Sequence, residues 1–456
     1  MYKFNPKIFL WSSPLYCIDP ERSFYHSIFL KESPKIFRLF FALVFLIRSL
    51  FTGLKQIAKN KIIGCKYISA REPKYVIYLP SAFLDISNKN CNYFPSAPKS
   101  CSYLVTDHPN TIPRNFISLM ISLFGEITPV FRRINSSGSR LIRLSSWLIY
   151  LSYFLSLEVL SNYILACSVD SLCNSQSDIK HICLHEMHPY SRVVYGVSSS
   201  HDSFSIAIQH AFIHRTRLLF DIKSLPFRPY LPDLFFIWST ETLNQMISFG
   251  WSNDKFRFCA SERYSESLLI NENESIDNRF LSSNNKNSKI KSNMVLFIPS
   301  LLRADFYLCI QSAFFLRTQF PDLKLVIKFH PSFKLSVQDL FLILKLLRLK
   351  IKLEKDSIQS LSLLKPLTFA YSSTAIYESA FYGCSSFLIP TFSIFNKSEL
   401  VLKDKLYSIV KDFLSSKILN HINDDLYISP ERAYSFFGLN RTKMFSILDN
   451  DNETSS

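Results

Sequence analysis

Short apolar runs rich in β-branched and aromatic residues recur along most of the chain and alternate with stretches in which apolar residues follow helical spacing. The runs form two series, separated by a polar stretch. The first series comprises residues 75–80, 102–107, 181–187, 203–210, 233–239 and 255–261, and the second comprises residues 294–300, 324–330, 351–355, 367–372 and 385–390. Strands that alternate with helices are typical of parallel sheets covered by helices on both faces. We therefore predict the α/β class, with two Rossmann-like, doubly wound domains facing a cleft.

Domain boundaries follow from the same pattern. Residues 271–293 include only four apolar residues and show no periodicity, which is typical of a linker. A chain of 456 residues is long enough for two core-forming domains. We expect an N-terminal Rossmann-like domain over 71–270, a C-terminal Rossmann-like domain over 294–456 and an N-terminal extension over 1–70.

The N-terminal extension contains a basic and apolar segment. Residues 35–66 carry seven basic residues and no acidic residue around the apolar stretch 39–47. This stretch is much shorter than the ~20 apolar residues that span a bilayer. We expect an amphipathic helix that lies on an anionic membrane surface. A helix that faces the core and keeps its lysines in solvent explains the pattern equally well.

Composition adds three points. The formal net charge of +16 indicates an acidic partner, which includes nucleic acid, anionic lipid and phosphorylated substrates. The ten cysteines form no CxxC pair, which favours reduced thiols. The N-terminus lacks the pattern of a secretory signal, so we expect a cytoplasmic protein, peripheral on the inner face of the cell membrane. Only 8 residues are glycine, so a glycine within a motif can be replaced in this chain.

Two features of the second domain fall at the carboxyl ends of predicted strands, where doubly wound sheets bind ligands. His330 follows one strand, and Ser372, Ser373 and Thr374 follow another and precede a predicted helix over 375–382. Free N–H groups at a helix N-terminus, together with nearby hydroxyls, favour a phosphate. A simple N-cap is the alternative, but a cap needs one hydroxyl and three are present.

Glu378 lies one turn inside the same predicted helix. A capping box requires the acidic residue three positions after the cap, whereas Glu378 follows Thr374 by four positions and Ser373 by five. Its carboxylate is therefore a candidate acceptor for ribose hydroxyls, by analogy with dinucleotide sites.

The segments "KFHP" (328–331) and "YSSTAIYESAFYG" (371–383) make the phosphate site more specific. They resemble the His-Pro and Ser-Ser/Thr motifs of GT-B glycosyltransferases that build bacterial capsule, O-antigen and lipopolysaccharide, and similar motifs occur in bacterial sialyltransferases, Kdo transferases and CDP-glycerol glycerophosphotransferases. This resemblance implies that a nucleotide-activated sugar binds the second domain without a metal or other cofactor. The nucleotide phosphates would then be held by His330, Ser372, Ser373 and Thr374.

The first domain has two polar segments at the ends of predicted strands, "HICLHEMHPYSR" (181–192) and "IAIQHAFIHR" (206–215). The second resembles the Gln-His-Gly segment of capsule and O-antigen transferases, with Ala211 in place of glycine. Glycosyl transfer needs a base for the acceptor hydroxyl, and Glu186 is the candidate, with His188 and His210 as rivals. A structural ion pair between Glu186 and Arg192 is the alternative.

Zinc ligation is a further alternative for this region. The candidate ligands are His181, His185, Glu186, His188, His210 and His214. However, "HEMH" has a spacing of three where the helical zinc motif needs four, and no cysteine pair supports a site. We therefore expect no metal.

These observations favour one function over several others. We expect a metal-independent, inverting glycosyltransferase that moves a sugar from a nucleotide donor to a hydroxyl of a surface glycan or a lipid-linked acceptor. Transfer of glycerol phosphate from CDP-glycerol is the nearest alternative. A non-catalytic nucleic-acid-binding or membrane-binding protein is an alternative of another class, although the chain has no zinc finger, RNP-like motif or P-loop. A catalytically inactive scaffold is a third alternative, suggested by Ala211 alone.

Overall fold

The computed structural model describes most of the chain: residues 4–5, 8–9, 35–68, 73–81, 84–85, 90–91, 93–94, 97–134, 136, 139–176, 178–184, 187–211, 213, 220, 222–223, 230–261, 264, 293–300, 303–330, 337–371, 373–389, 398–421 and 425–453. The chain forms two compact units. Unit 1 comprises residues 1–263 and 441–456, and unit 2 comprises residues 264–440. The sequence-based division had instead placed residues 441–456 in the second domain. The expected linker, 271–293, lies outside the described residues except for its last residue.

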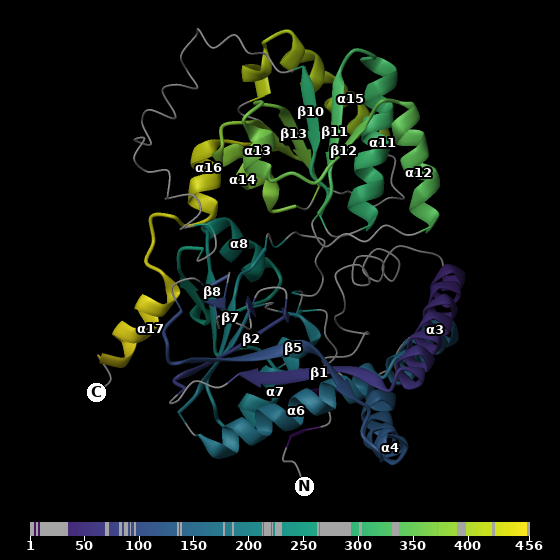
Figure 1. Cartoon of the computed structure of the whole chain (residues 1–456), viewed down its shortest axis with the longest axis vertical. Coiled ribbons are helices and arrows are strands. Elements are labelled where there is room, and N and C mark those ends of the chain that lie inside the picture. Colours follow the sequence, from purple (N-terminus) through teal and green to yellow (C-terminus); the bar gives the residue numbers. More distant parts are fainter. Residues whose placement is uncertain are drawn as a thin grey trace. The chain divides into compact units, whose positions relative to one another are not determined.

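Unit 1 is built on a seven-stranded sheet with the order β1-β5-β2-β6-β7-β8-β9 (Figure 1). Its strands are β1 (Lys61–Ile68), β2 (Tyr75–Leu79), β5 (Cys101–Thr111), β6 (Lys180–Cys183), β7 (Ser205–Ile208), β8 (Leu234–Ile237) and β9 (Phe256–Phe258). All neighbours are parallel except β1, which pairs antiparallel with β5. Without β1, the strands follow the flavodoxin-like order of doubly wound sheets.

The helices of unit 1 are α3 (Lys35–Ala58), α4 (Phe116–Ile134), α5 (Arg140–Leu155), α6 (Glu158–Ser175), α7 (Pro189–Ser200), α8 (Thr240–Ser248) and α17 (Met444–Glu453). Helices α5 and α6 are separated at Leu157, which adopts a left-handed conformation (φ 59°) between them. A short hairpin of β3 (Leu84–Asp85) and β4 (Asn90–Cys91) completes the unit.

The N-terminal extension expected over residues 1–70 is part of unit 1. The segment 35–66 is helical only as far as α3, and the chain then forms β1, whose alternating exposure (Lys61 exposed, Ile62 buried) is that of an edge strand. The expectation of one helix through residue 66 is therefore wrong at its carboxyl end. Ile62 packs with Leu157 and Leu160, so β1 contributes to the unit's interior.

Unit 2 is built on a six-stranded sheet with the order β12-β11-β10-β13-β14-β15. Its strands are β10 (Met294–Phe297), β11 (Lys324–Lys328), β12 (Lys352–Glu354), β13 (Leu367–Ala370), β14 (Ser385–Leu388) and β15 (Tyr427–Ile428), and only β15 is antiparallel. Its helices are α11 (Arg303–Gln319), α12 (Val337–Arg348), α13 (Ile358–Ser362), α14 (Ala375–Phe381), α15 (Ser398–Leu414) and α16 (Pro430–Phe436). In chain order the strands run 3-2-1-4-5-6, the order of dinucleotide-binding Rossmann domains.

The strands at the centre of both sheets are buried along their whole length, as in β2, β7, β10 and β13. Continuous apolar runs of this kind are expected where helices cover both faces of a parallel sheet. Two doubly wound α/β units therefore confirm the fold class predicted from the sequence.

The C-terminal helix α17 packs against unit 1. The Phe445 ring contacts the rings of Tyr75 and Phe94, with centroid distances of 5.7 and 6.0 Å. The Asp449 carboxylate accepts hydrogen bonds from the Lys74 ammonium and the Tyr75 hydroxyl, both at 3.0 Å. The last residues of the chain therefore complete a domain that is otherwise formed by its first half.

Candidate functional site

The carboxyl edge of the unit 2 sheet carries the residues that the sequence singles out in the second domain. β10 lies between β11 and β13, and Phe297 of β10 is opposite both Ile327 of β11 and Phe369 of β13. The chain moves outwards from β10 through β11 to β12 and then returns to β13 on the other side of β10. Ligands of doubly wound sheets bind outside the strand ends at such a switch point.

β11 places two basic residues at this edge. Lys328, the last residue of β11, is buried, and His330 follows two positions later and is half-buried. The strand ladder continues at Phe329, whose N–H donates to the Glu354 carbonyl at 2.9 Å. Because side chains alternate along extended backbone, Lys328 and His330 project from one face and Phe329 from the other. Phe329 contacts Phe306 of α11 (ring centroids 5.4 Å apart), so the two basic residues lie on the opposite face from α11.

β13 leads into the hydroxyl-bearing segment. Ser373 is buried, and Thr374 is half-buried at the N-cap position of α14. The Thr374 side chain makes no capping hydrogen bond. Main-chain bonds serve the first turn instead: Ile376 N–H donates to the Ser373 carbonyl (3.3 Å), and Tyr377 N–H donates to the Thr374 carbonyl (3.1 Å). The simple N-cap explanation therefore fails for Thr374, while Ser372 lies outside the described residues.

Lys328 is a cation at this edge that the sequence reasoning missed. Burial lowers the pKa of its ammonium group, and the nearby carboxylates of Glu378 and Asp356 oppose that change. The Lys328 Nζ donates to the Phe329 carbonyl at 3.2 Å, and an ammonium group has three donors in all. Glu378 is half-buried on α14, and its carboxylate lies near the Lys328 ammonium group. The available signal was a lysine within the otherwise apolar run 325–329.

In unit 1, two of the three predicted catalytic residues lie close to each other. β6 and β7 are parallel neighbours; His188 is the N-cap of α7 after β6, and His210 comes two positions after β7. Burial lowers the pKa of His188 to about 3, and the nearby His210 and Arg192 add to this effect. His188 is therefore neutral at neutral pH and poorly matched to general-base catalysis, which needs a pKa near the working pH. Glu186 lies outside the described residues.

Gln209 fixes the segment that carries His210. Its side-chain amide is buried and donates to the Ala211 carbonyl and the Thr242 hydroxyl, both at 3.1 Å. The amide oxygen accepts from the Trp238 N–H at 2.9 Å, and the Gln209 carbonyl accepts from the Tyr93 hydroxyl at 3.2 Å. Gln209 thus ties the end of β7 to the loop after β8 and holds the next residue, His210, at the edge of the sheet.

Ala211, which replaces the glycine of the resembled motif, does not have a positive φ. The backbone at this position is one that any residue adopts, so no glycine is required. The replacement is therefore compatible with the same turn.

His181 has a structural role. The ring shares a hydrogen bond with the Tyr78 hydroxyl (Nδ1, 2.7 Å) and contacts the Cys173 thiol (Nε2, 3.4 Å). Burial lowers its pKa to about 4, and His201 adds to the effect, so the ring is neutral. Among the described residues no group of three His, Cys, Asp or Glu side chains could hold a metal ion. His185 and His214 are not among those residues.

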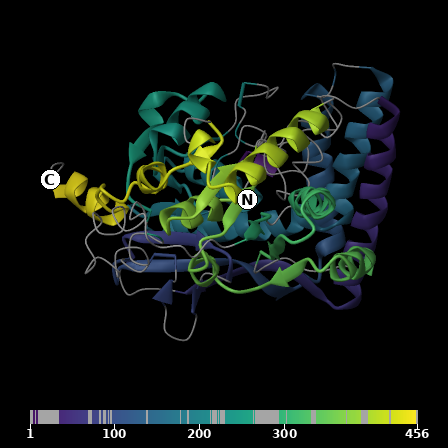
Figure 2. The same cartoon turned by 90° about the horizontal axis from the view of Figure 1, so that it is seen from above.

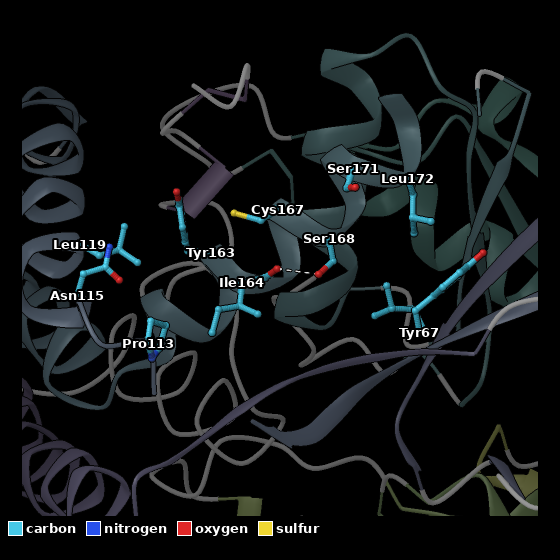
Figure 3. Close-up of a pocket in the computed structure, with 11 residues that line it drawn as sticks. Tyr67, Pro113, Asn115, Leu119, Tyr163, Ile164, Cys167, Ser168, Ser171 and Leu172 are labelled. Atoms are coloured by element: carbon cyan, nitrogen blue, oxygen red, sulfur yellow. Dashed lines mark hydrogen bonds between the residues drawn. The ribbon is translucent and has the colours of Figure 1, made fainter. Parts of the chain in front are cut away.

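A cavity of about 610 Å³ lies elsewhere in unit 1, beside α6 (Figure 3). Its lining comes from β1, β5, the region that begins α4, and α6, and it includes the Ser168 hydroxyl, which donates to the Ile164 carbonyl at 3.0 Å. None of the predicted site residues lines it. The described residues that line it include no carboxylate, imidazole, ammonium or guanidinium group, so they offer no acid–base pair for sugar transfer.

Comparison with known proteins gives only distant similarities. No protein-family model matches the chain, and no curated protein sequence matches it significantly. Among solved structures, a putative UDP-N-acetylglucosamine 2-epimerase from Listeria monocytogenes aligns with a TM-score of 0.40 and 12% identity, covering 61% of this chain and 76% of that one. Alr3699/HepE from Anabaena, in complex with UDP-glucose, aligns with a TM-score of 0.40 and 12% identity, covering 83% and 98%.

A third similar structure is the UDP-GlcNAc 2-epimerase from Methanocaldococcus jannaschii, with a TM-score of 0.38, 12% identity and coverage of 82% of this chain and 99% of that one. At such scores these similarities do not bear on the ligand or the reaction. Both are inferred below from the topology and residues of this chain.

Proposed function

We propose that the protein is a metal-independent glycosyltransferase that takes its sugar from a nucleotide-activated donor held by unit 2. One observation carries this proposal: basic residues at the carboxyl end of β11 and hydroxyls after β13 flank β10 at the switch point of a sheet with Rossmann strand order. Neighbouring strands lie about 4.8 Å apart. An anion over the end of β10 would therefore have donors on both sides.

Each group at this edge fits a part of a nucleotide sugar. His330 and Lys328 would bind the phosphates from the β11 side, and the hydroxyls of Ser373 and Thr374 from the β13 side. α14 has only seven residues, so its dipole contributes little and the side chains carry the charge complementarity. Glu378 would accept hydrogen bonds from the ribose hydroxyls, as predicted from its place in the helix.

Unit 1 would supply the base. In an inverting transfer the acceptor oxygen attacks the anomeric carbon, its proton passes to the base, and the nucleoside mono- or diphosphate leaves with the electron pair of the broken C–O bond. Glu186 and His210 are the candidates for this base. The lowered pKa of His188 suits it to the role of a neutral hydrogen-bonding partner. The resemblance of the two motifs leads us to propose a hydroxyl of a surface glycan or a lipid-linked acceptor, in the cytoplasm.

A nucleotide panel tests this proposal. CMP, CDP, UDP and GDP are added one at a time to the full chain, and the shift in melting temperature is measured. We expect one of them to stabilise the protein, because a ligand that binds only the native state raises its stability. His330→Ala and Ser373→Ala should weaken that shift. His421→Ala is the matched control. The His421 ring is hydrogen-bonded to the Asp412 carboxylate at 3.0 Å, and the residue does not lie at the ends of β11 or β13, where the phosphate site is proposed.

The outcomes separate the hypotheses. If no nucleotide shifts the melting temperature, or if His330→Ala and His421→Ala respond alike, the phosphate site is wrong. If cytidine nucleotides alone bind and CDP-glycerol is consumed as donor, the protein is a glycerophosphotransferase. Tight oligonucleotide binding that weakens steeply with salt, without any effect of nucleotides, would favour the nucleic-acid alternative.

A further inference from the structure

Helices α3 and α5 of unit 1 pack together through small residues. The buried residues on α3 include Ala42, Ser49 and Gly53, and those along one stripe of α5 and its C-cap are Ser145, Ile149, Ser152 and Ser156, of which all but Ile149 are small. A Cβ added to Gly53 would lie 1.9 Å from the Leu155 carbonyl oxygen, so the two backbones are in direct contact there. Figure 2 shows α3, in purple, running beside blue helices of the same unit.

The large apolar side chains of α3 face outwards instead. We define the outer stripe as Phe40, Val44, Ile47, Phe51 and Leu54, which recur at spacings of four and three residues and so occupy one face of the helix. All five are exposed, Phe51 by 68% and Phe40 by 59%. On α5, Leu144 and Leu151 are exposed as well. A helix of a water-soluble core has the reverse arrangement, with its large apolar residues inside.

This inside-out arrangement is typical of helices surrounded by lipid. In a bilayer, helix pairs associate through small residues that allow close backbone approach, and their large apolar side chains face the lipid tails. The small-residue contact and the exposed outer stripe are separate observations, and both point to the same surroundings. Monomeric soluble proteins seldom expose continuous apolar surfaces of this kind without a partner.

Charge identifies the lipid headgroup. Arg48, Lys55 and Lys59 follow one another at spacings of seven and four residues, which places them along one flank of the outer stripe, and all three are exposed. Helices α3, α4 and α5 together contain eight basic residues and one acidic residue, Glu126. Such a flank complements the negative potential of anionic lipids.

The way the helices meet the bilayer follows from their length and composition. No single helix among the described residues is long and apolar enough to cross a membrane. By length and composition alone, one pair of segments passes the same test together, Arg143–Leu155 with Glu158–Ser175, which meet at a bend of 61°. Many residues of α6, the second of these, are buried within unit 1.

We propose that the outer stripe of α3, with the exposed leucines of α5, inserts among the headgroups of an anionic lipid bilayer while Arg48, Lys55 and Lys59 bind lipid phosphates. The helix lies in the plane of the interface, as amphipathic anchors do. This surface belongs to unit 1 alone and does not depend on the nucleotide chemistry proposed for unit 2.

Vesicle sedimentation tests this proposal with the full chain. The protein is mixed with phosphatidylcholine vesicles or with vesicles that also contain phosphatidylglycerol, and the bound fraction is measured at low and high salt. We expect binding to the anionic vesicles that falls with salt. The double variants Phe51→Ser/Leu54→Ser and Lys55→Glu/Lys59→Glu should each weaken it about tenfold or more, because both apolar burial and each basic side chain contribute to interfacial binding.

Matched variants in unit 2 serve as controls. Leu344→Ser/Leu347→Ser removes two leucines of α12 that are 61% and 58% exposed, and Lys403→Glu/Lys411→Glu reverses two exposed charges of α15. Both should bind like the unmodified protein, and circular dichroism confirms the folding of every variant. If the unmodified protein does not bind anionic vesicles, or if test and control variants bind to them equally, the proposal is wrong. A dimer in analytical ultracentrifugation that Phe51→Ser/Leu54→Ser abolishes, without vesicle binding, would assign the surface to a second copy and also overturn it.

Discussion

At the scale of single residues, the loop that carries His210 depends on one buried amide. The side chain of Gln209 makes three hydrogen bonds: one to Ala211 in its own loop, and two to Trp238 and Thr242 in the loop after β8 and in α8. Leaving a buried polar group without its hydrogen-bond partner lowers the stability of the fold by more than a solvent-exposed hydrogen bond raises it. Gln209 is therefore a positioning residue: it fixes the backbone of the loop that carries His210.

Gln209→Ala should lower the free energy of unfolding by about 1–3 kcal/mol, because the Trp238 N–H loses the amide oxygen to which it donates and the Thr242 hydroxyl keeps its bond to Ser239 but loses the one from Gln209. Urea unfolding followed by tryptophan fluorescence measures the change. Gln245→Ala is the matched control, since that amide donates to the exposed Ser248 hydroxyl, and it should change stability by less than ~0.5 kcal/mol. Equal effects of the two variants would contradict the role given to Gln209.

At this scale the sequence predicted where the site residues lie along the strands better than it predicted what each residue does. His330 could be predicted at a strand end because "LVIKF" (325–329) is an apolar run interrupted by one lysine, and because His330 follows this run and Pro331 comes next. Lys328 and Gln209 were missed as functional residues because their importance comes from contacts with other strands, which a linear pattern does not contain. The lowered pKa of His188 likewise depends on burial and on two charges brought close by folding.

At the scale of elements, α3 shows how one glycine sets a helix–helix distance. Gly53 lies where α3 touches the end of α5, and the Leu155 carbonyl occupies the space that a side chain would need. Gly125 of α4 has nothing within 4 Å of an added Cβ. Alanine substitution at Gly125 therefore measures the helix preference of alanine alone, whereas the same substitution at Gly53 also measures the cost of crowding.

Gly53→Ala should lower the free energy of unfolding by roughly 1–3 kcal/mol, since the backbone contact must open to admit a methyl group. Gly125→Ala should raise it by about 0.5–1 kcal/mol, because alanine favours the helix and is not obstructed. Thermal unfolding of both variants provides the measurement. A stabilised Gly53→Ala variant would mean that α3 and α5 are not packed as described.

The parallel strands of both sheets could be predicted from the alternating pattern, but β1 and the short hairpin of β3 and β4 could not. Residues 61–66 have the same mixture of basic and apolar residues as the end of α3, and only their pairing with β5 makes them a strand. The short strand β15 was also missed, because two residues carry no recognisable alternation and their conformation is set by pairing with β14.

At the scale of the whole molecule, unit 1 is assembled from both ends of the chain. α17 covers the first strand of the parallel series through Phe445 and Asp449, although about 370 positions separate these residues from Tyr75. A domain boundary placed at the polar stretch alone cannot predict this, because no change in composition near residue 441 signals that the chain returns to unit 1. The strand series on each side of that stretch, in contrast, predicted the two sheets correctly.

Removing residues 441–456 should destabilise unit 1 and leave unit 2 intact. Hydrogen exchange followed by mass spectrometry should show faster exchange in β2, whose Tyr75 loses its contacts with Phe445 and Asp449. The strands β10 and β13 of unit 2 serve as the internal reference and should keep their protection. Faster exchange in β10 with unchanged β2 would show that the C-terminal residues support the other unit.

The discontinuity of unit 1 also sets an order of events during synthesis. Every strand of the unit 2 sheet precedes α17 in the chain and leaves the ribosome before it, so that sheet can form before Phe445 is available to contact Tyr75 and Phe94. Nascent domains generally fold as units. In this protein the domain that begins first is consequently the last to be finished, and its aromatic residues are the ones that a chaperone would meet on an incomplete chain.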